Sequence, residues 1–144
     1  MSRCTHALLL AAVAIGCSSQ PDCDLRAELR ARAGTGAIDC GHAVLGGGKP
    51  VDDCVVGAFN SGGAFFALYD QWGIDSKVVS GVAGDKNGGV TFLLWQDAMA
   101  GSGGHPVITG DTCIGPAVDT SQPKNPSTPP LTCATTSSLG RTCG

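Results

Sequence analysis

The chain has 144 residues, a formal net charge of −3 and 42% hydrophobic residues. This length and hydrophobic content suffice for one core, so we expect one domain. The basic residues are scattered, apart from three arginines near residue 30 that lie beside acids, and this excludes the basic patch of a nucleic-acid-binding protein. With 22 glycines and 5% aromatic residues, the chain should be loop-rich around a small core. The eight cysteines are then the most informative count.

Residues 1–16 have the pattern of a secretory signal peptide. Arg3 lies near the start, an apolar run covers residues 7–15, and the small residue Gly16 precedes Cys17. The run is shorter than the roughly 20 apolar residues that a transmembrane helix needs. We therefore expect residues 1–16 to be absent from the mature protein.

The sequence Ala14-Ile15-Gly16-Cys17 resembles the lipobox of bacterial lipoproteins. In that family the cysteine is lipidated and becomes the first residue of the mature chain. The resemblance implies a lipid on Cys17, which makes the membrane a partner, and a short tether over residues 17–21. Under the same resemblance, Ser18 favours the outer membrane of the bacterial cell envelope. Lipoproteins usually carry Leu where this chain has Ala14, and cleavage nearby by an ordinary signal peptidase is the alternative.

Two segments have helical patterns. Residues 22–33 predict a short N-terminal helix with Asp22 or Asp24 as the N-cap and Gly34 as the stop. The principal helix follows Pro50, and its apolar residues recur on one face: Val51, Cys54, Val55, Ala58 and Phe59.

Three short apolar runs after the principal helix predict strands over residues 64–69, 77–83 and 90–95. Asn87-Gly88 between the last two runs is typical of a tight hairpin, and residues 105–109 predict a fourth, edge strand. We expect an α+β fold with the principal helix packed on an antiparallel sheet of three or four strands. Their interface should contain Val55, Phe59, Phe66, Leu68, Val79, Phe92 and Leu94.

The remaining segments are expected to pack less. Residues 34–49 form a connector with a little strand at 43–45. Residues 114–144 are rich in proline, serine and threonine and predict an extended tail that packs poorly by itself. The α+β domain therefore covers residues 22–113, and disulfides should tie the tail back to it.

Six cysteines remain when Cys4 is removed with the signal peptide and Cys17 carries the lipid. An even number in an exported chain predicts three disulfides, and the absence of paired CxxC units argues against zinc. Spacing alone leaves many connectivities open. Cys40 with Cys54 is the first choice, and Cys113 with Cys133 and Cys23 with Cys143 would pin the tail and the first helix to the core.

No residues form a catalytic or metal-binding pattern in the sequence. His42 and His105 are the histidines left after the signal peptide, and Gly-x-Ser-x-Gly is absent. A metal site built from these histidines with Asp97 or Asp111 would require distant loops to converge. Asp52 and Asp53 begin the principal helix, where the helix dipole favours carboxylates. We therefore assign no catalytic residue, no metal ligand and no cofactor.

The order of residues around Asp39-Cys40-Gly41, Asp53-Cys54 and Gly73-Ile74-Asp75-Ser76 resembles small uncharacterised lipoproteins of the kind abundant in myxobacteria. The resemblance spans about residues 40–113 and implies no activity. We expect a non-enzymatic binding, interaction or structural module at the cell envelope, with an unidentified envelope partner. An inhibitor of an exported hydrolase is the first alternative, and a metal-dependent or other enzyme is the second.

The expected contact surface lies at one end of the sheet. In an up-and-down meander, the turn after the first strand and the loop after the third lie at the same end. This places Trp72 near the loop over residues 96–104, which contains Met99 and Ser102. An exposed tryptophan is a frequent interface anchor. The alternative is that Trp72 folds back as a lid over the core.

Overall fold

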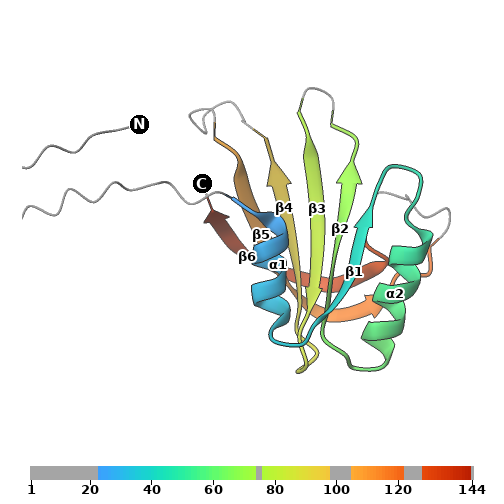
Figure 1. Cartoon of the computed structure of the whole chain (residues 1–144). Coiled ribbons are helices and arrows are strands. Elements are labelled where there is room, and N and C mark those ends of the chain that lie inside the picture. The colour runs from blue at the N-terminus through green and yellow to red at the C-terminus, as the bar shows by residue number, and fades with distance from the viewer. Residues whose placement is uncertain (1–22, 74–75, 98–104, 122–127, 144) are drawn as a thin grey trace, which may run out of the picture.

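The computed structural model describes residues 23–73, 76–97, 105–121 and 128–143. Two helices lie against a six-stranded mixed sheet (Figure 1). The helices are α1 (Leu25–Ala33) and α2 (Lys49–Asn60), and the strands are β1 (Ile38–Ala43), β2 (Phe65–Gln71), β3 (Val78–Gly84), β4 (Val90–Gln96), β5 (Val107–Val118) and β6 (Leu131–Cys143). The strands lie in the sheet in their order along the chain. The α+β class is confirmed. The sheet has six strands rather than three or four, and it is mixed rather than antiparallel.

Strand β1 makes the sheet mixed, because it pairs parallel to β2 whereas every other neighbouring pair is antiparallel. A parallel pair needs a long crossover, and α2 supplies it. The sequence pattern predicted only a connector with a little strand at 43–45 here. Its apolar pattern is weak because β1 is an edge strand with a register shift between Asp39 and His42, at the positive-φ residue Gly41.

Strands β5 and β6 correct the expectation of a poorly packed tail. Strand β5 continues past position 109 to Val118, and β6 pairs with it along nearly its whole length. Pro116 is tolerated in β5 because the pairing of β5 with β4 ends at Cys113. The other described prolines of this region, Pro129 and Pro130, precede β6. Threonine and serine suit an edge strand whose side chains stay exposed.

Helix α1 covers one face of the sheet. The Asp24 carboxylate caps it by accepting hydrogen bonds from the backbone N–H groups of Arg26 (2.9 Å) and Ala27 (3.1 Å). Its buried residues, Leu25, Leu29 and Ala33, pack in one cluster with Phe66, Leu68, Val79, Ala83, Leu93 and Ile108. Figure 1 shows α1 lying across the front of the sheet.

Helix α2 belongs to a second cluster on the opposite face. Val51, Val55 and Ala58 pack there with Phe65, Ala67, Tyr69, Val82 and Val90. The expected single interface is therefore wrong. Phe66, Leu68 and Val79 belong to the α1 cluster, and Leu94 is half-buried and belongs to neither. Side chains alternate along a strand, so a sheet that is covered on both faces divides its apolar residues between two clusters.

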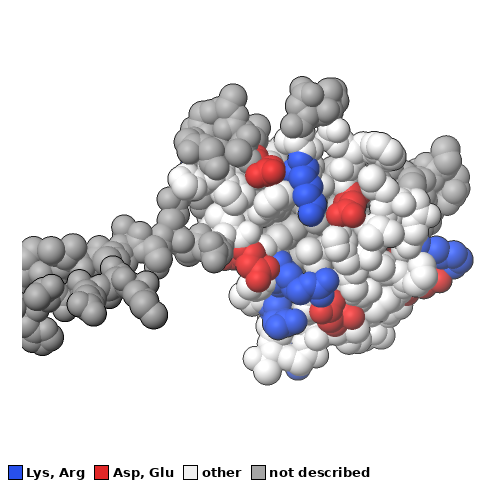
Figure 2. All heavy atoms as spheres, turned by 45° about the horizontal axis from the view of Figure 1, so that its top comes forward, with Lys and Arg blue, Asp and Glu red and all other residues white. Residues whose placement is uncertain are grey.

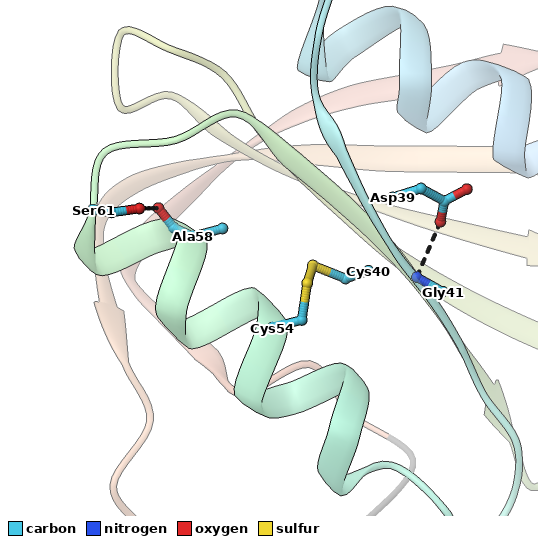
Figure 3. Close-up of a disulfide and its surroundings, with 6 residues drawn as sticks. All are labelled: Asp39, Cys40, Gly41, Cys54, Ala58 and Ser61. Carbon is cyan, nitrogen blue, oxygen red and sulfur yellow. Dashed lines mark hydrogen bonds between the residues drawn. A yellow bond between two sulfur atoms is a disulfide. The ribbon is translucent and has the colours of Figure 1, made fainter.

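Three disulfides connect these elements, in the pairing expected from the sequence. They join Cys23, before α1, to Cys143 at the end of β6; Cys40 in β1 to Cys54 in α2; and Cys113 in β5 to Cys133 in β6. Figure 3 shows the Cys40–Cys54 disulfide attaching α2 to the edge strand, and the Ser61 hydroxyl donating to the Ala58 carbonyl where α2 ends.

Candidate functional site

Exposed apolar residues gather where β1 and β2 finish, which we call the β1–β2 end. Because the two strands are parallel neighbours, the residues that follow them emerge at the same end of the sheet. Val44 and Leu45 follow β1 with 58% and 40% of their surface exposed, and Trp72 follows β2 with 82% exposed. In the described part of the chain, six large apolar side chains are exposed, and these are three of them.

A groove of about 290 Å³ adjoins this end on the face that α1 covers. The start of α1 forms one wall of this α1 groove. Leu68, Val79 and Trp95 contribute apolar lining from three neighbouring strands. The polar lining is of both kinds: Asp24 contributes an acid, and Arg26, His42 and Lys77 contribute basic groups. The groove thus combines a small apolar surface with polar groups of both signs.

Two of the three basic side chains lie beside carboxylates. The Nε2 atom of His42 lies 2.8 Å from the Oδ1 atom of Asp70 across the β1–β2 pair. Arg26 donates to Asp39 at 2.5 Å. Lys77 forms no ion pair with any described residue. Figure 2 shows the mixed result, with acidic and basic residues interspersed on the face turned to the viewer rather than one patch of a single sign.

The predicted contact residues are only partly within the described chain. Trp72 is exposed, as in the first of its two expected arrangements, and its role in contact stays a prediction. Met99, Ser102 and the lipidation site Cys17 lie outside the described residues. The register aligns Gln71, Val78 and Gln96 across β2, β3 and β4, so the loop after β4 begins at the same end as Trp72.

The two histidines do not meet. His42 lies in β1 and His105 precedes β5, so β2, β3 and β4 lie between them in the sheet. Among the described residues, no three His, Cys, Asp or Glu side chains are grouped so that they could hold a metal ion.

The position of Asp52 in the fold explains this acid without a catalytic role. It lies in the first turn of α2 and acts on Tyr69, which is fully buried in β2. Burial raises the pKa of the Tyr69 hydroxyl far above its ordinary value of 10.0, and the negative charge of Asp52 raises this pKa further. The hydroxyl therefore stays neutral over the whole physiological pH range.

Sequence reasoning missed both the α1 groove and the gathering of Val44 and Leu45 with Trp72. Neither has a sequence signal, because the groove depends on the packing of α1 against the sheet and the gathering depends on the parallel pairing of β1 with β2. No helix in the described part of the chain has the length and apolar character needed to cross a membrane. Comparison of the chain with family models, with curated proteins and with solved structures found no match.

Proposed function

We propose that this protein is a non-enzymatic binding module of the bacterial cell envelope, held at the membrane by a lipid on Cys17. Its contact surface is the β1–β2 end. The observation that carries the proposal is the exposure of Val44, Leu45 and Trp72 where two neighbouring strands finish.

Exposed apolar groups that gather in this way are typical of interaction sites, whereas single exposed apolar residues are ordinary. Trp72 is the strongest member of the group, because tryptophan buries a large area when a partner covers it and is enriched among the residues that dominate binding energy. The neighbouring His42–Asp70 pair would lie at the rim of such an interface, where polar residues are usual.

The membrane anchor fits this geometry. The tether from Cys17 reaches the described chain at Cys23, and Cys23 lines the α1 groove beside the β1–β2 end. Six residues of extended chain span at most roughly 20 Å. A lipid on Cys17 would therefore keep the contact surface close to the membrane, where an envelope partner is found. No feature of the described residues favours a hydrolase inhibitor or an enzyme, and we propose neither.

Capture from native envelopes tests the contact surface. Wild-type protein should retain a specific partner, and Trp72→Ala should lose it. Ile114→Ala is the matched control, because Ile114 is a large apolar residue that is 55% exposed and lies in β5. Equal capture by wild type and Trp72→Ala would reject the β1–β2 end as the contact surface.

The anchor has a separate test. Mass spectrometry of protein extracted from membranes should show an acylated N-terminal Cys17, and Cys17→Ser should release the protein or change its location. A water-soluble native protein that begins at another residue would contradict the anchor.

A further inference from the structure

We propose that two copies of this chain associate by pairing their β6 strands, edge to edge and antiparallel, so that the two sheets become continuous. Strand β6 is the last strand of the sheet, and among the described residues only β5 pairs with it. Its other edge therefore offers backbone N–H and C=O groups to which no described strand is paired. The inference goes beyond the proposed function, because β6 lies at the opposite margin of the sheet from β1.

Strand β6 is long and exposed. It has 13 residues, and residues 134–141 are all exposed although the side chains of a strand alternate between the two faces. Both faces of this segment therefore meet solvent. Helix α1 packs mainly on β2, β3 and β4, and α2 packs mainly on β1 and β2, so this segment of β6 stays uncovered.

The other edge of the sheet is protected against a further strand. Strand β1 has only six residues, carries Asp39 and His42, and shifts register at the positive-φ residue Gly41. The Oδ1 atom of Asp39 accepts the backbone N–H of Gly41 at 3.0 Å, so this donor is already bonded within the chain (Figure 3). A short strand, charged side chains and an irregular register are features that keep exposed edges from pairing.

The edge of β6 lacks these features over residues 132–138. This run, TCATTSS, contains no charged residue and no proline, and its pairing with β5 shows no register shift. Pro129 and Pro130 precede it, and the positive-φ Gly140 and the charged Arg141 follow it. The irregular and charged positions therefore lie outside the run and leave its middle, at Thr135, open to pairing.

The composition of the run favours a second copy as the occupant. Antiparallel pairing about a two-fold axis at Thr135 places Thr132 of each copy opposite Ser138 of the other. No like charges meet, and cross-strand pairs of threonine and serine are favourable. A different protein would have to be selected by charges or apolar pockets, and the run offers neither. A second copy needs no such selection, because two-fold symmetry supplies a strand of matching length and composition.

The mass of the particle in solution tests the association. The chain from residue 17 is purified with Cys17→Ser and with its disulfides formed, so that neither a lipid nor a thiol at residue 17 joins the copies. A strand-edge contact is smaller than a standard interface of roughly 1,200 to 2,000 Å², so the dimer should be weak. Sedimentation equilibrium should show it forming between roughly 10 μM and 1 mM.

Like charges at the axis should separate the copies. Thr135→Lys places two lysines opposite each other and should weaken dimerisation about fivefold or more, since like charges directly opposite on paired strands are destabilising. Thr132→Lys is the matched control, because Thr132 is an exposed threonine of the same strand. Its two lysines would lie six residues apart along the strands, roughly 20 Å, so dimerisation should be unchanged.

Opposite charges at the axis should restore the pairing. An equimolar mixture of Thr135→Lys and Thr135→Glu should form a heterodimer, because the two introduced side chains attract each other across the axis. Each variant should keep the urea midpoint of the wild-type monomer, since both substituted positions are exposed.

The proposal is overturned if the wild-type chain is monomeric at about 1 mM, if both lysine variants weaken association equally, or if the mixed variants form no heterodimer. If a monomeric chain loses envelope capture in Thr135→Lys, the edge binds a strand of another protein instead. Trp72→Ala should leave the dimer intact, and a monomer in this variant would move the contact to the β1–β2 end. Capture depends on Trp72 and dimerisation on Thr135, so the two failures can be told apart.

Discussion

The disulfides close loops of very different length, and this difference makes a quantitative prediction. Cys23 and Cys143 are 120 residues apart, and Cys40 and Cys54 are 14 residues apart. Cross-links stabilise a fold mainly by restricting the unfolded chain, and longer loops restrict it more. The chain-entropy relation gives about 4.9 kcal/mol for the long loop and about 3.0 kcal/mol for the short one at 25 °C.

The perturbation is a pair of double variants, Cys23→Ala with Cys143→Ala and Cys40→Ala with Cys54→Ala. All four cysteines are half-buried, so the loss of side-chain burial is similar in both variants. Urea unfolding followed by tryptophan fluorescence should show the Cys23/Cys143 variant about 2 kcal/mol less stable than the Cys40/Cys54 variant. The slope of free energy against urea should rise in both, because the unfolded chain becomes less compact. Equal stabilities, or the reverse order, would refute the loop-entropy reasoning.

Three further predictions follow from packing and charge. A Cβ atom at Gly81 would lie 2.4 Å from Cδ1 of the fully buried Leu29. Gly81→Ala should therefore force α1 away from β3 and lower the free energy of unfolding in urea by about 1 to 3 kcal/mol. An unchanged urea midpoint would contradict this contact. Gly57→Ala is its control: a Cβ there meets nothing within 4 Å, so the variant should gain about 0.5 to 1 kcal/mol. Because the pKa of Tyr69 is raised in the folded state, the unfolded chain loses its tyrosine proton first, so stability should fall as pH rises above the unfolded value of 10.0. Tyr69→Phe should remove this fall in the free energy of unfolding between about pH 9 and 11. If the fall persists in the variant, other groups cause it. In Trp95→Phe the emission of Trp72 should be red-shifted and open to acrylamide, since 82% of this side chain is exposed; a blue, protected spectrum would place it in the core.

Apolar periodicity determined the centre of this fold. The helical spacing from Val51 to Phe59 and the apolar runs that became β2, β3 and β4 are local patterns. Helix α2 buries Val51, Val55 and Ala58 of its apolar stripe, and β2 and β3 are buried along most of their length. The number of cysteines predicted three disulfides but left their connectivity open, and the structure shows the pairing that had been the first choice. Gly57 is an exception. Close packing was the expected reason for this glycine, and the structure leaves its surroundings open.

The outer strands were not determined locally. Strand β1 carries few apolar residues, and β6 is built largely from exposed threonine and serine, so neither has the alternation that marks a half-buried strand. Their stability comes from backbone pairing with β2 and β5 and from disulfides to α2 and β5. Pairing between segments that are distant in the chain leaves no periodic signal in either segment.

Tertiary structure alone decided the candidate site. Val44 and Trp72 are separated by the whole of α2 and β2, and they share one end of the sheet because the α2 crossover makes β1 parallel to β2. The same pairing brings His42 to Asp70. The packing of α1 on the sheet places Arg26 at one groove with Lys77 and Trp95. Residue composition supplied these side chains, but strand direction brought them together, because the direction of a strand decides at which end of the sheet its last residues emerge.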